Sequence, residues 1–266
     1  MTKLTIFLFN LILNCHHERV LERAAGLTFR VLLAFFPFIV FLMALIGYLN
    51  LDESAIMNEL YEILPGDISY LITNFVAELS ATRSGGVLST ALFFSIYNTT
   101  NGFRAVIRCV NMSYGINDSR GIIKQVLLSF VLMLLFTVAL VVMMGLLVFE
   151  RQLWGIVFDF DSELLVTVIS SGAALVVLIM TTMLIYRLAC AKKMPVRHVL
   201  PGAVFTVLSW AVVSSLFGFF TQNFSQYPAV YGSMAGVFIL ILWLNIVSVI
   251  LLVGNEANVL LGDYFR

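Results

Sequence analysis

Long uninterrupted runs of apolar residues limit most strongly how this 266-residue chain can fold. About 20 mostly apolar residues in a helix cross the roughly 30 Å hydrocarbon core of a bilayer. Five stretches meet this length: 31–51, 126–149, 164–186, 199–220 and 234–254. Because 61% of the side chains are hydrophobic and only 11% are charged, an aqueous core would leave large apolar patches exposed. The sequence therefore predicts an all-α, multi-pass membrane protein.

A shorter and more polar stretch, residues 86–102, is the sixth candidate span. If all six stretches cross, nearly every lysine and arginine lies on one side of the membrane, and only Arg83 and Arg151 lie on the other. Lysine and arginine mark the cytoplasmic side of a membrane protein. We therefore predict six spans with both termini in the cytoplasm, because five spans would separate the basic clusters.

The segments outside the spans complete a single membrane domain over residues 1–266. Residues 1–29 combine apolar and charged positions, and we predict a cytoplasmic amphipathic helix that lies in the membrane interface. Residues 52–85 show two runs with helical periodicity around Pro65 and Gly66, which predicts an external helical hairpin. The acidic residues of the external loops either attract cations or form an ordinary solvated surface.

A polar stripe follows the second span. Asn101, Arg104, Arg108 and Asn111 have i, i+3, i+7, i+10 spacing, so a helix would align them on one side. Two arginines in such a stripe can bind an anionic head group or line a water-filled cavity. The alternative is an ordinary basic helix end at the inner membrane surface.

Other polar residues within or beside the spans are further candidates. Asn245 lies in the middle of the last span, and Glu256 follows it, where it can neutralise Arg104 or Arg108, couple to protons, or fix the bundle by ion pairing. The uncharged external connection before the last span adds three candidates for lining a cavity: Asn223, Ser225 and Tyr231. Four residues have predicted structural roles, which are anchoring for Arg30, a kink for Pro37, and close helix contact for Gly232 and Gly236.

The composition argues against several other classes of protein. Cys15, Cys109 and Cys190 contain no C-x-x-C pair, and the three histidines are scattered, so we predict neither a metal site nor a cofactor. The formal net charge of zero removes the basic excess typical of nucleic-acid binding. The sequence contains no nucleotide-binding loop, so transport would be secondary or driven by a partner.

Several motifs together resemble the YihY/BrkB family of bacterial inner-membrane proteins. They are Arg23-Ala24-Ala25-Gly26-Leu27-Thr28-Phe29 with Phe35-Phe36-Pro37, Gly102-Phe103-Arg104-Ala105-Val106-Ile107-Arg108 with Asn111 and Tyr114-Gly115, Pro201-Gly202-Ala203, Asn223-Phe224-Ser225 with Tyr227 and Tyr231-Gly232-Ser233, and Trp243-Leu244 before Gly254-Asn255-Glu256-Ala257-Asn258. The resemblance implies a multi-pass protein of the bacterial inner membrane that supports envelope integrity. Some members of the family have carried the label of a transfer-RNA-processing ribonuclease.

Three functional hypotheses follow. The first is a protein that binds or moves a lipid-like, amphipathic molecule through a cavity among the second, fifth and last spans, with membrane lipids as its surroundings. The second is a scaffold without transport that organises envelope proteins. The third, a membrane-bound ribonuclease, ranks last, because a metal-dependent nuclease needs clustered His, Asp or Glu ligands that this sequence lacks. We therefore predict no enzymatic activity and no nucleic-acid partner.

Overall fold

The computed structural model describes residues 3–48, 74, 85–148, 163–223 and 234–264. These residues form seven helices and no strand, which confirms the all-α prediction for the described part of the chain. The helices are α1 (Lys3–His17), α2 (Val20–Tyr48), α5 (Gly85–Ser113), α6 (Ile122–Val148), α8 (Glu163–Ala189), α9 (Val196–Asn223) and α11 (Met234–Tyr264).

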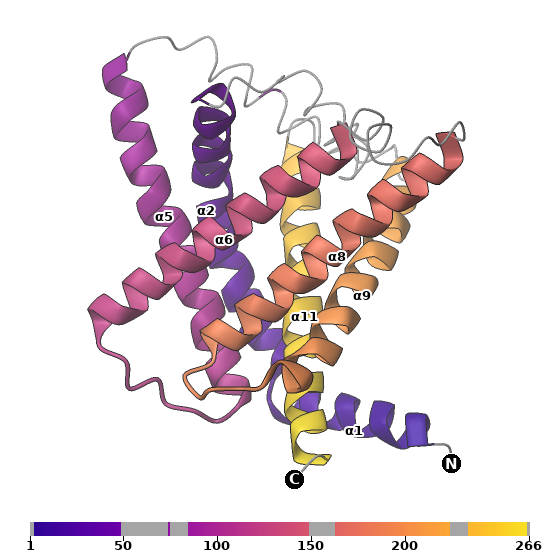
Figure 1. The fold of residues 1–266 in the computed structure, drawn as a ribbon. Coiled ribbons are helices and arrows are strands. Elements are labelled where there is room, and N and C mark those ends of the chain that lie inside the picture. Colours follow the sequence, from indigo (N-terminus) through magenta and orange to yellow (C-terminus); the bar gives the residue numbers. More distant parts are fainter. Residues whose placement is uncertain (1–2, 49–73, 75–84, 149–162, 224–233, 265–266) are drawn as a thin grey trace.

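The six long helices form a ring of neighbours (Figure 1). Around this ring α2 packs on α5, α5 on α6, α6 on α8, α8 on α9, α9 on α11, and α11 again on α2. Each long helix runs in the opposite direction to the one before it, and both ends of the chain lie at the lower end of the bundle in Figure 1. The short helix α1 packs at this lower end against α11 and α2.

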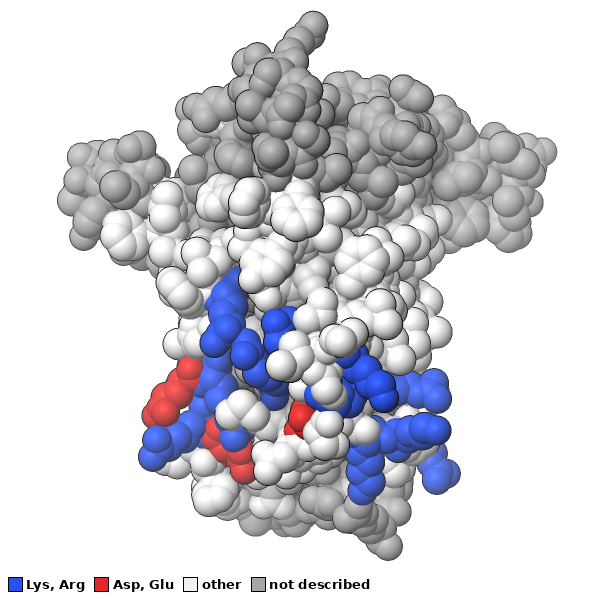
Figure 2. Space-filling model, turned by 90° about the vertical axis from the view of Figure 1, so that its left-hand side faces the viewer, with Lys and Arg blue, Asp and Glu red and all other residues white. Residues whose placement is uncertain are grey.

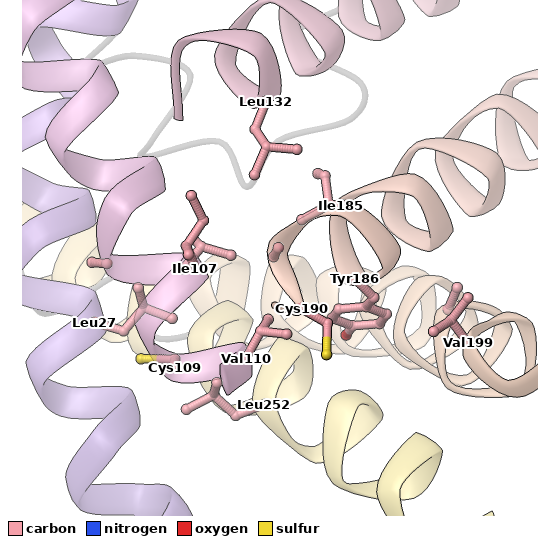
Figure 3. Close-up of a cluster of buried hydrophobic side chains, with 14 of the residues drawn as sticks. Leu27, Ile107, Cys109, Val110, Leu132, Ile185, Tyr186, Cys190, Val199 and Leu252 are labelled. Atoms are coloured by element: carbon pink, nitrogen blue, oxygen red, sulfur yellow. The ribbon is translucent and has the colours of Figure 1, made fainter. Parts of the chain in front are cut away.

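The main hydrophobic core lies where the six helices converge. Every helix of the ring contributes to it, including Leu27 of α2, Ile107 of α5, Leu132 of α6, Tyr186 of α8, Val199 of α9 and Leu252 of α11 (Figure 3). A second core cluster contains Ile39 of α2, Phe217 of α9, and Leu240, Trp243 and Leu244 of α11. Many apolar residues on the outer faces of the helices remain exposed, as expected when lipid surrounds a bundle.

Five helical segments are long and apolar enough to cross a membrane: Val20–Leu42, Ile122–Leu147, Val166–Ala189, Val196–Thr221 and Gly236–Gly262. The predicted sixth span falls in α5, which continues beyond it to Ser113. With 29 residues, α5 is about 43 Å long at about 1.5 Å per residue, but it contains the polar run from Asn98 to Asn101. The count of six spans therefore stays a prediction.

The N-terminal segment consists of α1 and the first turns of α2. The chain turns between the two helices at Arg19, whose φ of 49° lies in the left-handed region. Leu11 of α1 packs inward, whereas Phe9 and Ile12 are exposed, so α1 presents apolar side chains both to the bundle and to its surroundings. The predicted interfacial helix of residues 1–29 is thus divided at this turn, and α2 begins well before the predicted span at residue 31. The external hairpin predicted for residues 52–85 lies almost entirely outside the described residues.

Candidate functional site

A pocket of about 340 Å³ opens between α2 and α5. Its lining comprises Arg30 and Leu33 of α2 and Asn98, Asn101, Arg104 and Arg108 of α5. The two helices can approach closely beside it because Gly102 has no side chain. A Cβ at Gly102 would lie 2.9 Å from the Cβ of Ala34.

The pocket gathers three arginines without a carboxylate. No ion pair among the described residues involves Arg30, Arg104 or Arg108. The positive charges of Arg30 and Arg104 both act on Arg108, so the three guanidinium groups share one region of positive potential. Figure 2 views the molecule from the side of α5 and shows the lysines and arginines of that face gathered in its lower half.

Apolar side chains continue the pocket along both helices. Leu33 lies one turn beyond Arg30 on α2, and its side chain is exposed. On α5, the exposed Phe94 and Tyr97 precede Asn98 and Asn101 by one turn on the same side of the helix. In Figure 2 a white, uncharged band lies above the basic region. A positively charged pocket beside exposed apolar groups suits a molecule with an anionic head and an apolar tail.

The structure separates Asn111 from the rest of the predicted polar stripe. Asn111 is buried at the end of α8, where its Nδ2 donates to the carbonyls of Ile107 (2.8 Å) and Ala189 (2.9 Å). Its Oδ1 accepts a hydrogen bond of 2.7 Å from the backbone N–H of Ala191. Asn111 therefore satisfies backbone groups at the C-terminus of α8 and lies outside the pocket lining.

Two residues that the sequence analysis did not select complete this helix cap. The guanidinium of Arg120 donates to both carboxylate oxygens of Asp118, at 2.7 and 2.8 Å, and to the carbonyls of Ala189 (2.7 Å) and Leu188 (3.3 Å). A cation at a helix C-terminus opposes the negative end of the helix dipole. Asp118 also accepts a hydrogen bond from the backbone N–H of Arg120, two residues later, which is the pattern of an Asx-turn. An Asp-x-Arg sequence between two predicted helices could therefore have indicated this turn.

The Asp118–Arg120 pair predicts a pH-dependent contribution to stability. Hydrogen bonds from Arg120 hold the pKa of Asp118 below its ordinary value. Such a carboxyl stabilises the fold above the unfolded pKa of about 3.9, and this stabilisation is lost as the pH falls through the folded pKa. We expect Asp118→Asn to cost about 1 kcal/mol of unfolding free energy at pH 7 and progressively less below about pH 4. Thermal unfolding from pH 7 to pH 3 measures this, and a constant cost at all pH values would contradict it.

Glu256 of α11 lies outside the pocket lining, in a cluster with Asn14 of α1 and Arg23 of α2. It is fully buried, its Oε2 accepts a hydrogen bond of 2.9 Å from Asn14, and its Oε1 lies 3.7 Å from a guanidinium nitrogen of Arg23. Arg23 also pairs with Glu18. The expected ion pairing within the bundle therefore involves Arg23, and the described ion pairs include none between Glu256 and Arg104 or Arg108.

The other residues of the Gly254–Asn258 turn connect α11 to further helices. Asn255 donates to the carbonyl of Val110 on α5 at 3.4 Å, and Asn258 accepts a hydrogen bond of 2.7 Å from the backbone N–H of Gly202 on α9. The hydroxyl of Tyr186 on α8 donates to the carbonyl of Leu251 at 2.6 Å. This turn of α11 is therefore a polar junction that joins most of the bundle.

The remaining predicted residues lie elsewhere. The amide of Asn245 donates to the Thr28 hydroxyl at 3.2 Å and so links α11 to α2, away from the pocket lining. Arg30, predicted as an anchor, lines the pocket, and Pro37 lies inside α2. Gly236 is in the first turn of α11, and Asn223 ends α9. Ser225, Tyr231 and Gly232 lie outside the described residues.

The pocket thus joins the first two long helices, whereas we expected a cavity among the second, fifth and last spans.

The fold and the comparisons with known proteins agree on the class of this chain. Long apolar helices in alternating directions define a multi-pass helical membrane protein. The family model described as virulence factor BrkB matches residues 11–265. The chain belongs to this family, which confirms the resemblance found in the sequence.

Relatives in the family are named in two ways. The ribonuclease-like protein YfkH of Bacillus subtilis (strain 168) is 31% identical over 245 residues, which cover 90% of this chain and 89% of that protein. A UPF0761 membrane protein of Chromobacterium violaceum is 24% identical over 245 residues, and these cover 89% of this chain but 57% of the relative. Another, from Alteromonas mediterranea, is 30% identical over 102 residues, or 38% of this chain and 33% of that protein. No solved structure matches this chain significantly.

Proposed function

We propose that this protein binds an amphipathic, lipid-like anion in the pocket between α2 and α5, in support of the bacterial envelope. The observation that carries the proposal is the group of three arginines that have no carboxylate partner among the described residues. Uncompensated cations at one site repel each other, and a bound anion relieves this repulsion. Binding of this kind is the first step of a secondary or partner-driven carrier, or of delivery to an envelope protein.

The proposal includes a topology with six crossings and both termini in the cytoplasm of a bacterial inner membrane. The alternating directions of the long helices support an even number of crossings, as does the placement of both chain ends at one end of the bundle (Figure 1). The basic residues on α5 and on the connections from α5 to α6 and from α8 to α9 lie at this same end. In this orientation the pocket faces the phosphate-rich surface of the inner leaflet.

Catalysis on RNA is not part of the proposal, although one relative is named ribonuclease-like. His16 and His17 end α1, whereas His198 lies in the first turn of α9. In the part of the chain that the structure describes, no group of three or more His, Cys, Asp or Glu residues is arranged to hold a metal ion.

Photolabelling in proteoliposomes tests the proposal. We expect a long-chain fatty acid with a photoreactive group in its chain to label the peptides of α2 and α5 that flank the pocket. Replacing Arg104 and Arg108 together by glutamine should reduce this labelling about tenfold or more, because charge-assisted hydrogen bonds are lost. Mass spectrometry of the labelled peptides gives the measurement.

A matched control removes the same charge elsewhere. Lys193 and Arg197 are exposed, lie at the same end of the bundle and are absent from the pocket lining, so their double replacement by glutamine should leave the labelling unchanged. Equal labelling of all long helices, or an equal loss in both double variants, would overturn the proposal.

A further inference from the structure

We propose that the pocket between α2 and α5 selects a lipid whose head group ends in a phosphate monoester. This inference rests on the proposed function and names the chemical class of its ligand. It follows from three features of the pocket, which are its charge, its hydrogen-bond donors and the apolar surface that adjoins it.

The charge of the pocket favours a doubly charged head group. Arg30, Arg104 and Arg108 place three positive charges around one opening, with no described carboxylate paired to them. A phosphate monoester carries between one and two negative charges near neutral pH, and neighbouring cations drive it to the fully ionised form. A phosphodiester offers a single negative charge. A zwitterionic head group would bring its own cation against the three guanidinium groups.

The donors of the pocket also match a terminal phosphate. Guanidinium groups present rigid forks of N–H donors that bind phosphate oxygens in pairs. Asn98 and Asn101 add amide donors to the same lining, and one N–H of Asn98 is already used by the carbonyl of Phe94 at 2.9 Å. A monoester has three terminal oxygens to receive these donors from two helices, whereas a diester has only two.

The surroundings of the pocket favour a lipid over free phosphate. Leu33 forms part of the lining, and Phe94 and Tyr97 extend an exposed apolar surface along α5 from the pocket toward the other end of the helix. The pocket volume of about 340 Å³ leaves room for more than one phosphate group. The head group and its glycerol can enter the pocket while the acyl chains lie against the apolar surface. Inorganic phosphate makes no use of that surface.

Binding of short-chain lipids to the purified full-length protein in detergent tests this inference. The probes are dioctanoyl phosphatidic acid (a monoester), dioctanoyl phosphatidylglycerol (a diester), dioctanoyl phosphatidylcholine (a zwitterion) and inorganic phosphate. At pH 7.5 we expect phosphatidic acid to bind about tenfold more tightly than phosphatidylglycerol and at least a hundredfold more tightly than phosphatidylcholine or inorganic phosphate. At pH 5.5 the preference over phosphatidylglycerol should shrink, because the free monoester is then mostly singly charged and must release a proton to bind in its fully ionised form.

Variants show whether the pocket is the binding site. Arg30→Gln and Arg104→Gln should each weaken phosphatidic acid binding about tenfold, whereas Arg104→Lys should retain part of the affinity because it keeps the charge but loses the fork. Arg197→Gln, at an exposed position outside the pocket, should change the affinity less than twofold.

Each contrary outcome has a distinct meaning. Equal affinity for the monoester, the diester and the zwitterion would overturn this inference and leave amphiphile binding intact. Competition by inorganic phosphate as effective as that by phosphatidic acid would overturn the assignment to a lipid. An equal loss in Arg197→Gln would show binding to general surface charge and overturn the site. Absence of binding by every lipid, together with absence of photolabelling at α2 and α5, would overturn the proposed function as well.

Discussion

Replacing Gly202 or Gly254 by alanine is expected to lower the free energy of unfolding by about 3 kcal/mol, because α9 and α11 cross at these residues without room for a Cβ. A Cβ at Gly202 would overlap the carbonyl oxygen of Gly254. A Cβ at Gly254 would overlap the Thr206 hydroxyl and lie 2.9 Å from the carbonyl oxygen of Gly202. Backbone atoms cannot move aside as a flexible side chain can, so the helices must separate. Thermal unfolding of the purified variants in detergent measures the loss.

Gly218 provides the matched control in the same helix. A Cβ at Gly218 would have no atom within 4 Å, so Gly218→Ala should be neutral or stabilising by up to about 1 kcal/mol through helix propensity. If Gly202→Ala and Gly218→Ala unfold at the same temperature, α9 and α11 do not cross as closely as described. The crossing also connects to α8, because the hydroxyls of Tyr186 and Thr206 lie 2.7 Å apart.

Replacing Glu256 by leucine is expected to cost about 3 kcal/mol and to release α1 from the bundle. Glu256 is the buried acceptor for Asn14 of α1 and lies 3.7 Å from Arg23 of α2, so its loss leaves buried polar partners without compensation. Glu256→Gln retains an acceptor for Asn14 but removes the charge, and its cost should be intermediate. Limited proteolysis near Arg19 reports the release of α1, and thermal unfolding reports the cost.

Glu22 provides the contrast for Glu256. It pairs with Arg19 at 3.5 Å, but both side chains are more than two-thirds exposed, at 71% and 75%. Exposed pairs contribute between zero and about 1 kcal/mol, so Glu22→Gln should change stability little and leave cleavage at Arg19 unchanged. Equal effects of Glu256→Leu and Glu22→Gln would contradict the buried junction.

The polar stripe on α5 shows how far helical spacing can predict a site. Asn101, Arg104 and Arg108 meet in one pocket as the spacing suggested, and Asn98 joins them from the preceding turn. Asn111 does not, although it lies only about 20° around the helix from Arg104, seven residues earlier. At that position the end of α8 lies against α5, and its backbone groups take up the amide.

Glu256 shows the corresponding limit for charge pairing. Glu256 is an acidic residue near the end of an apolar run, which indicated a partner of opposite charge. Arg104 and Arg108 were candidates for that partner because they were predicted to lie on the same side of the membrane. The partner in the structure is Arg23, because this side of α11 packs against α2 and α1. Periodicity along one helix carries no information about which neighbouring helix faces a given side.

The sequence by itself determined that this chain forms long apolar helices and belongs among multi-pass membrane proteins, because apolar length and helix formation depend on residues close together in the chain. Its motifs also identified the family. Only the tertiary structure decided that Arg30 of α2 completes the pocket on α5, that Asn111 caps α8, and that Glu256 holds Arg23 and Asn14. These contacts depend on how each helix is rotated and where it crosses its neighbours, and close crossings such as that of Gly202 and Gly254 arise from residues far apart in the sequence.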